Sequence, residues 1–268
     1  MIPVNSASHR DLGFTGRLAG HWYAVYGDVL WCAPGVTDMR RDRPGFHGMV
    51  RDAVSRMTDD PLKVVDLALN DDWPVRHQRQ FVPWNAKGDR LVGAGVARVE
   101  VIDGTPTVTK RFGPRGYWWD SKTTARYGDV CAYRDEHSEY IYIWGGPPTY
   151  ITDWLNKSYT YLARVKAADA FDLGKYEYFW GRQQGWKREV LNRFTPETAV
   201  LWGTGQGQVF WSPYYKCYVL VHLALATPID GGLVYAGVAH PYHDPSGKTL
   251  VVSYTNNNHI EVIKIVFE

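Results

Sequence analysis

Three segments of this chain repeat one order of features, and this repeat constrains the fold more than any other part of the sequence. Each segment has a glycine, a short strand with an aromatic residue, a polar turn and then a more hydrophobic strand. The segments are Gly128–Trp144, Gly207–His222 and Gly237–Ser253. We expect a fourth and a fifth copy at Trp22–Trp31 and Gly95–Phe112. Repeated antiparallel hairpins with no helices between them are typical of radially repeated folds.

The remaining pattern also favours strands over helices. Helical periodicity is scarce, and its best examples, Pro61–Leu69 and Val165–Leu173, are short and interrupted by Asp. Alternating and β-branched segments between Gly, Asp, Asn and Pro are abundant. The expected strands are Trp22–Trp31, Ala97–Ile102, Thr107–Phe112, Tyr140–Trp144, Tyr218–His222, Leu250–Tyr254 and Ile260–Phe267. We predict a single all-β domain over residues 1–268, a five-bladed β-propeller, with a β-sandwich as the competing fold.

Charge and cysteine content argue against several classes of protein. Thirty Lys and Arg residues balance 28 Asp and Glu residues without long runs, so the sequence lacks the basic clusters that are typical of nucleic-acid-binding proteins. No segment approaches the ~18 apolar residues of a membrane span. Cys32, Cys131 and Cys217 lack Cys-x-x-Cys spacing and allow at most one disulfide. We expect no cofactor, no nucleic-acid partner and no membrane partner, while the oligomeric state stays open.

Aromatic content is high, with 12 Trp, 18 Tyr and 9 Phe. Most of these rings should pack between sheets, but Trp and Tyr near a cleft also suit stacking on sugars or flat apolar ligands. The partner we expect is therefore a small molecule or an oligosaccharide. The adjacent Trp118 and Trp119 cannot both face inward on a strand, so one should be exposed or line a pocket.

Polar residues that follow a glycine mark the strands expected to converge on a propeller axis. Gly27-Asp28, Gly128-Asp129 and Gly207-Gln208 share this arrangement, and His240 lies near the start of the last copy. Glycine allows backbones to approach closely, and carboxylates gathered there could act as a glycosidase acid and its partner. The alternative interpretation is that Asp after Gly only closes a turn.

Two histidines are candidates for acid–base chemistry. His222 ends a strong strand, and His240 follows the Gly237 start. The histidines form neither His-x-His nor His-Glu-x-x-His, so we expect no metal site. Asn156-Lys157-Ser158 is an N-glycosylation sequon between two hydrophobic segments, where a surface loop is expected.

These motifs resemble a family of five-bladed propellers related to glycoside hydrolases and long catalogued as a domain of unknown function. The resemblance rests on Trp22–Asp28, Met49–Ser55, Tyr127–Asp129 and Tyr235–Pro241, and it runs along nearly the whole chain. It implies a secreted fungal protein whose leader is absent from this sequence. Some bacterial relatives are endo-acting hydrolases of furanoside polymers such as arabinan, and aspartates at the first Gly-Asp, here Asp28, belong to their site.

The sequence departs from that family at two motifs. The usual Gly-Asp-Thr reads Gly27-Asp28-Val29, which loses a hydroxyl that could orient the carboxylate. The usual Arg-Asn-Ser reads Arg51-Asp52-Ala53, which replaces an amide by a carboxyl group. Because hydrolysis needs two carboxyl groups held at a defined spacing and protonation, these changes argue against ordinary glycoside hydrolysis.

A second branch of similar fungal propellers implies a different activity. Its members are glycosylated hetero-Diels–Alderases that join tropolone quinone methides to humulene-type terpenes. An aromatic funnel that orients two apolar substrates can supply much of the rate acceleration of this cycloaddition by positioning alone. We predict a secondary-metabolism cyclase of this type, with a glycoside hydrolase of furanoside glycans and a non-catalytic carbohydrate-binding propeller as alternatives.

The sequence analysis ends with two sets of candidate residues and one modification site. The candidate catalytic residues are Asp28, Asp52, Asp129, His222 and His240. The candidate substrate-binding residues are Arg51, Trp118, Trp119, Tyr127, Gln208 and Tyr235. The candidate glycosylation site is Asn156.

Overall fold

The structure is a computed structural model that describes residues 1–6, 8–33, 36, 42, 47–70, 77–79, 81, 92–203, 205–222, 234–256 and 259–268. Its contacts group the chain into two compact units. The first unit comprises Met1–Asn85, Val99–Val108 and Ser212–Glu268, and the second comprises Ala86–Arg98 and Thr109–Trp211. The prediction of one domain over residues 1–268 stays a prediction.

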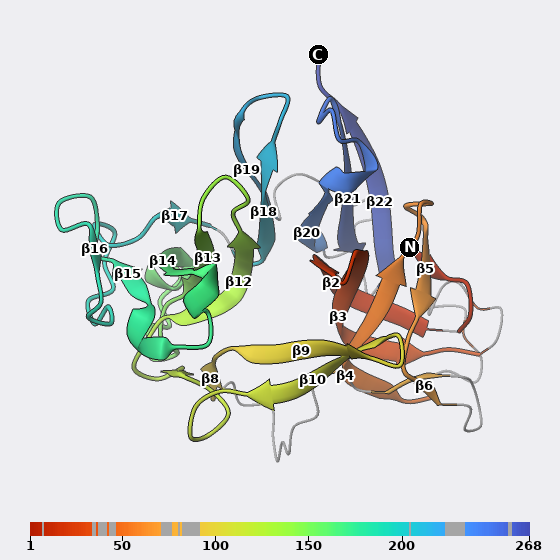
Figure 1. Cartoon of the computed structure of the whole chain (residues 1–268), viewed down its shortest axis with the longest axis horizontal. Helices are drawn as coiled ribbons and strands as arrows, with labels where there is room; N and C mark the ends of the chain where they lie inside the picture. Colours follow the sequence, from red (N-terminus) through yellow and green to blue (C-terminus); the bar gives the residue numbers. More distant parts are fainter. Residues whose placement is uncertain are drawn as a thin grey trace. The chain divides into compact units, whose positions relative to one another are not determined.

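The first unit contains a five-stranded sheet in the order β1-β5-β4-β3-β2 and a three-stranded sheet in the order β20-β21-β22 (Figure 1). Strand β1 runs parallel to β5, and the other neighbours are antiparallel. Strand β2 packs against all three strands of the smaller sheet. The elements are β1 (Ile2–Pro3), β2 (Ser8–Leu18), β3 (His21–Trp31), β4 (Met49–Met57), β5 (Lys63–Asp66), β6 (Leu69–Asn70), β7 (His77–Gln78), β19 (Cys217–His222), β20 (Val234–His240), η6 (Pro241–His243), β21 (Thr249–Asn256) and β22 (His259–Val266).

The second unit is centred on the antiparallel order β12-β13-β14-β15-β16, with β17 also paired to β14. Strands β8 and β11 form a separate antiparallel pair. The elements are β8 (Gly93–Ala94), β11 (Trp119–Asp120), β12 (Arg126–Arg134), β13 (Tyr140–Gly146), η2 (Asn156–Ser158), β14 (Tyr159–Lys166), η3 (Ala167–Asp169), η4 (Leu173–Lys175), β15 (Glu177–Phe179), β16 (Trp186–Lys187), β17 (Leu201–Trp202) and β18 (Gly207–Ser212), which ends at the boundary of the unit. Strands β9 (Ala97–Ile102) and β10 (Thr105–Arg111) form a hairpin that the two units share.

The all-β prediction is confirmed, because the described elements are strands and short 3-10 helices. The expected strand Ala97–Ile102 is β9, and the others fall on β3, β10, β13, β19, β21 and β22 within two residues at each end. Neither segment with helical periodicity is an α-helix. Lys63–Asp66 is β5, and residues 165–173 contain the end of β14 and the 3-10 helix η3. No sheet of the described residues closes on itself, and the five-bladed arrangement stays a prediction.

The expected fourth repeat was placed one strand too late. Trp22–Trp31 is a single strand, β3, and its hairpin partner is the preceding strand β2. The two strands are joined at Ala19 and Gly20, which both have positive φ, +47° and +83°. A two-residue turn with positive φ at both positions matches the twist of antiparallel strands.

Each unit has its own apolar core. In the first unit, Ala24, Tyr26, Val29, Ala53 and Ile260 pack together and are at most 2% exposed. In the second unit, the core is aromatic, with the buried rings of Trp119, Tyr127, Tyr161, Tyr176, Tyr178 and Trp180. The large aromatic content of the sequence is therefore explained in part by the filling of this second core.

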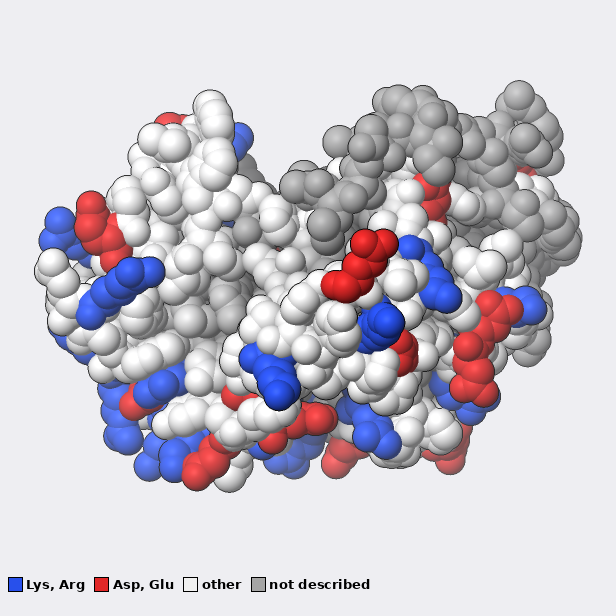
Figure 2. Space-filling model, turned by 90° about the horizontal axis from the view of Figure 1, so that it is seen from above, with Lys and Arg blue, Asp and Glu red and all other residues white. Residues whose placement is uncertain are grey.

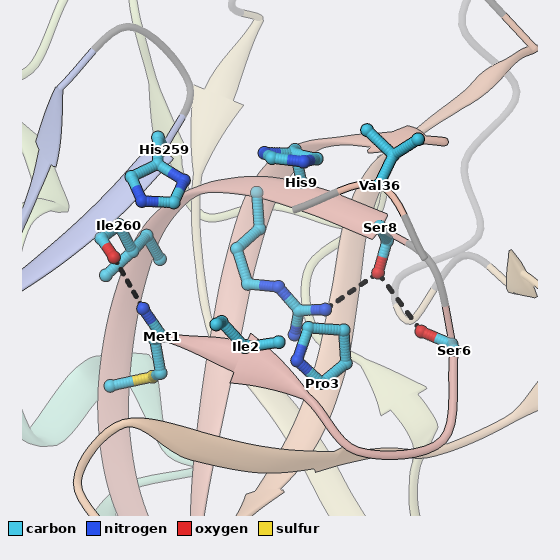
Figure 3. A pocket seen from close by; sticks show the side chains of 10 residues that line it. Met1, Ile2, Pro3, Ser6, Ser8, His9, Val36, His259 and Ile260 are labelled. Carbon is cyan, nitrogen blue, oxygen red and sulfur yellow. Dashed lines mark hydrogen bonds between the residues drawn. The ribbon is translucent and has the colours of Figure 1, made fainter. Parts of the chain in front are cut away.

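A buried ion pair joins β2 and β5 of the five-stranded sheet. Arg10 Nη1 lies 2.7 Å from Asp66 Oδ1, and the two side chains are 1% and 0% exposed. Ser8 and Ser55 donate hydrogen bonds to the Asp66 carboxylate at 3.0 and 2.6 Å. A hollow of about 120 Å³ lies next to this network, and Ser6 and Ser8 point toward each other at its edge (Figure 3).

The surface carries charges of both signs. On the face shown in Figure 2, Lys and Arg side chains are interspersed with Asp and Glu side chains. Among the described residues, no helix has the length and apolar character needed to cross a membrane.

Candidate functional site

A carboxylate cluster lies where the two sheets of the first unit meet. Asp11 of β2 is 8% exposed and was missed by the sequence analysis. Its Oδ1 atom accepts a hydrogen bond from the Thr255 hydroxyl at 3.0 Å, and its Oδ2 atom accepts one from the Tyr235 hydroxyl. The backbone N–H of Leu12 donates to the Thr255 hydroxyl oxygen at 3.0 Å. Asp11 thus joins β2 to both β20 and β21.

Backbone irregularities in three strands place these groups together. The β2–β3 register shifts between His9 and Asp11 and again between Leu12 and Phe14. Asp28 and Leu12 have φ values of +44° and +67°, a region that non-glycine residues rarely adopt. Such bulges re-aim side chains and are common beside functional sites. Because of the bulge, Asp28 is not confined to the face that strict alternation would give it.

The third irregularity is in the smaller sheet. Tyr235 lies opposite Thr255 in the β20–β21 register, which shifts between Tyr235 and Val238. Ala236, inside this bulge, has a φ of +56°. The two hydrogen-bond donors to Asp11 therefore come from directly opposite positions on neighbouring strands.

The cluster changes the acidity of its members. Burial raises the pKa of Asp11, and the negative charge of Asp28 acts in the same direction, while the hydrogen bonds from Tyr235 and Thr255 oppose the rise. Burial also raises the pKa of Tyr235 above its ordinary value, with further contributions from Asp11 and Asp28. Asp28 itself is exposed to solvent. The arrangement combines a buried carboxyl group that favours its protonated form with an exposed carboxyl group close by.

Arg51 and Asp52 lie on the next strand of the same sheet. Gly27 is paired with Asp11 on one side and with Asp52 on the other, so Asp11, Gly27 and Asp52 form one row across β2, β3 and β4. Both Arg51 and Asp52 are half-buried. Residues directly opposite each other in an antiparallel sheet share a face, so Asp52 lies on the same face as Asp11, across Gly27.

Asp129 also follows a glycine at a bulge, in strand β12 of the second unit. The β12–β13 register shifts between Tyr127 and Cys131, and Gly128 within this bulge has a φ of +106°. Asp129 Oδ2 lies 2.7 Å from Arg126 Nε, and Asp129 Oδ1 accepts a hydrogen bond from Gly146 N at 2.8 Å. Burial raises the pKa of Asp129, and the Arg126 charge opposes this rise.

The local sequence is the same at both bulges, Tyr26-Gly27-Asp28 and Tyr127-Gly128-Asp129. Asp28 and Asp129 belong to different units, each of which is described by itself. The expectation that these two carboxylates meet stays a prediction.

The predicted aromatic lining lies mostly in the core of the second unit. Trp119 is 2% exposed and donates its indole N–H to the Tyr178 hydroxyl oxygen at 3.0 Å. Trp118 is half-buried and packs edge-on against Trp119 at the side of the aromatic core, so neither ring is exposed; that one of them lines a ligand pocket stays a prediction. Tyr127 is 1% exposed. Gln208 is half-buried in β18.

The two candidate histidines differ in environment. His240 is 1% exposed, and its ring lies 2.8 Å from the Ser253 hydroxyl and 3.1 Å from the Tyr242 hydroxyl. Burial lowers the pKa of His240 to about 3, which keeps the ring neutral near pH 7. His222 is half-buried at the end of β19. His240 is therefore better placed to connect β20 and β21 than to exchange protons with a ligand.

The remaining positions that the sequence singled out are the sequon and the cysteines. Asn156 is half-buried at the start of η2. Cys32, Cys131 and Cys217 are free thiols, the first two buried and the third exposed. Within the described ranges, no three His, Cys, Asp or Glu side chains are grouped so as to hold a metal ion.

Comparison with known proteins gives a likeness of fold. A solved structure from Bacteroides ovatus, described as a "putative hydrolase", is 17% identical to this chain, with a TM-score of 0.55; the match covers 94% of this chain and 80% of that one. No family model and no curated protein matches the chain. At this identity the likeness shows the fold alone. The fungal resemblance, the cyclase activity and secretion stay predictions.

Proposed function

We propose that this chain is a glycoside hydrolase in which Asp11 and Asp28 are the acid and its partner carboxylate. The observation that carries the proposal is the hydrogen-bonded cluster of Asp11, Tyr235 and Thr255, with Asp28 near enough to raise the pKa of both Asp11 and Tyr235. Glycosidases use two carboxyl groups whose surroundings push their pKa values apart.

The two carboxyl groups suit different roles. Cleavage of a glycosidic bond needs a proton on the leaving oxygen and a carboxylate that attacks the sugar carbon or activates water. Asp11 is buried with a raised pKa, and it therefore suits the proton donor, with Tyr235 holding the carboxyl group in place. Asp28 is exposed, and it suits the carboxylate that faces the sugar. We assign Arg51 and Asp52, on the neighbouring strand β4, to the binding of sugar hydroxyls.

Two further observations support this choice over the cyclase. The cluster is made of carboxyl and hydroxyl groups, whereas a site that orients two apolar partners would be lined mainly by apolar side chains. The fold is also shared with a protein whose description names a hydrolase. Furanoside polymers, which the family resemblance suggests, are the first substrates to test.

The proposal extends to the architecture and the setting of the protein. The repeated antiparallel sheets and the recurring Tyr-Gly-Asp sequence support a five-bladed propeller. Secretion from a fungus is compatible with the sequon at Asn156, and mass spectrometry of protein from a eukaryotic host would test its glycosylation.

The experiment is a reducing-end assay on arabinan, arabinoxylan, galactan and xylan. We expect the wild-type chain to release reducing ends from at least one of them. Asp28→Asn and Asp11→Asn should each lower that rate by at least about a hundredfold, the usual contribution of a positioned acid or base. Both variants should keep the wild-type circular dichroism spectrum.

Asp103→Asn is the matched control. Asp103 is also exposed and also has a positive φ, +49°, but it lies in the turn of the β9–β10 hairpin. This variant should retain the wild-type rate. Release of reducing ends by Asp28→Asn at the wild-type rate would contradict the proposed roles, and so would an absence of turnover on all four glycans.

A further inference from the structure

The second unit exposes two tryptophans beside each other. Trp154 is 63% exposed and Trp202 is 49% exposed, and their ring centroids are 5.5 Å apart. Large indole rings are usually mostly buried in a folded chain. An exposed pair in contact leaves an apolar patch in water, and such patches mark interaction sites.

Both rings are held by local structure. Trp202 lies in β17 opposite Tyr159 of β14, and its indole N–H donates to the Leu155 carbonyl oxygen at 3.2 Å. The Ser158 hydroxyl donates to the Trp154 carbonyl oxygen at 2.8 Å. The Trp202 ring is thereby tied to the backbone next to Trp154, and such restraint lowers the entropic cost of binding.

A hollow is lined partly by residues of the segments that carry the two tryptophans. It has a volume of about 530 Å³ and is lined by Arg126, Thr149, Ile151, Thr152, Lys157, Ser158, Gly203 and Gly205. Trp202 directly precedes Gly203, and Trp154 lies between the lining residues Thr152 and Lys157. The segments that carry the rings therefore also contribute residues to the hollow.

The chemistry of this surface selects a class of ligand. An apolar peptide could pack on the rings but would make no use of the hydroxyl and ammonium groups that line the hollow. A nucleic acid would need a basic groove, but Arg126 is already paired with Asp129 at 2.7 Å. A sugar ring offers an apolar C–H face to an indole and hydroxyl groups to Lys157, Ser158 and the threonines.

We propose that Trp154 and Trp202, with the adjoining hollow, form a carbohydrate-binding site that holds a glycan chain by stacking. This site lies wholly in the second unit, apart from the Asp11 cluster of the first. It rests on the proposed function only for the choice of glycans to test. Its role is to bind a polysaccharide without cleaving it.

Affinity electrophoresis tests the proposal with arabinan, arabinoxylan, galactan, xylan and polygalacturonate in the gel. Protein from a bacterial host is used, so that Asn156, which lies beside the pair, carries no glycan. We expect at least one polysaccharide to retard the wild-type chain. Trp154→Ala and Trp202→Ala should each weaken the association about tenfold or more.

Tyr215→Ala is the matched control, because Tyr215 is 50% exposed and lies in the first unit. It should be retarded like the wild-type chain. Asp28→Asn should also be retarded normally, so a failure of hydrolysis and a failure of binding give different results. The proposal is overturned if no polysaccharide retards the wild-type chain, or if both tryptophan variants bind as tightly as it does.

Discussion

Asp66→Asn removes the negative charge that faces Arg10 in the interior of the first unit. The Arg10 guanidinium would then be buried, at 1% exposure, without its counter-ion. Breaking a buried pair by removing one partner costs about 3–5 kcal/mol. We expect the lower end, about 3 kcal/mol, because Asn keeps one acceptor oxygen for the surrounding hydroxyl groups.

Urea titration of the full chain, followed by tryptophan fluorescence, measures this loss. With m of about 1–3 kcal/mol/M, the unfolding midpoint should fall by at least about 1 M. Asp60→Asn is the control: its ion pair with Lys63, at 2.9 Å, is exposed, and the midpoint should stay at the wild-type value.

The double variant Arg10→Met/Asp66→Leu separates an unpaired charge from lost packing. It should be less destabilised than Arg10→Met alone or Asp66→Leu alone, since neither charge then remains buried without its partner. The reasoning is refuted if Asp66→Asn unfolds at the wild-type urea midpoint. It is also refuted if the losses in unfolding free energy of Arg10→Met and Asp66→Leu add up to the loss of the double variant.

The pH dependence gives an independent check on this pair. Burial opposes the ionisation of Asp66, but Arg10 and the surrounding hydroxyl groups outweigh it and hold the pKa of Asp66 below its ordinary value. The pair's contribution should therefore be complete above about pH 4, the unfolded value, and be lost as the pH falls through the lower folded value. Asp66→Asn should lose this part of the acid sensitivity.

Three further predictions concern other parts of the molecule. A thiol reagent should modify Cys217 rapidly in the native chain, and all three cysteines only after denaturation. The reason is that Cys32 and Cys131 are buried, and burial raises the pKa of both thiols to about 12. Rapid modification of more than one thiol in the native chain would contradict this. Trp119→Ala should cost about 3–5 kcal/mol in urea titrations because it empties a site in the aromatic core, whereas Trp118→Ala should cost less; equal losses would argue against the buried position of Trp119. Because burial raises the pKa of Asp11, its contribution to stability should be complete below its unfolded pKa and be lost as the pH rises through the folded value. The unfolding free energy of Asp11→Asn relative to wild type should therefore increase with pH in that window. A difference in unfolding free energy that does not change with pH would count against the burial of this carboxyl group.

Strand positions were predictable because their signal is local. Alternation and the bounding Gly, Asp and Asn residues located β9, β19 and β22 closely. The same local rule showed that Trp118 and Trp119 must differ, but not which ring enters the core. That choice depends on the strands that pack against each face, and no short segment contains this information.

The candidate site was only half predictable. Asp28 stood out because it follows a glycine, and Asp52 because it lies in a recognisable motif. Asp11 was missed because its partners, Tyr235 and Thr255, are more than 200 residues away in the chain. The available signal was Gly13 two residues after an acidic residue within a strand, a pattern that indicates a bulge. The surroundings of His240 were hidden for a related reason, since its buried partner Ser253 becomes visible only once β20 and β21 are paired.

Titration of the aspartate carboxyl carbons by NMR tests most directly whether Asp11 and Asp28 form a coupled acid–base pair. Asp11 should titrate above the ordinary aspartate range in the wild-type chain. Its pKa should fall in Asp28→Asn, because one cause of its elevation is removed. An Asp11 resonance that titrates in the ordinary range, or one that is unchanged by Asp28→Asn, would contradict the pairing on which the proposed hydrolysis depends.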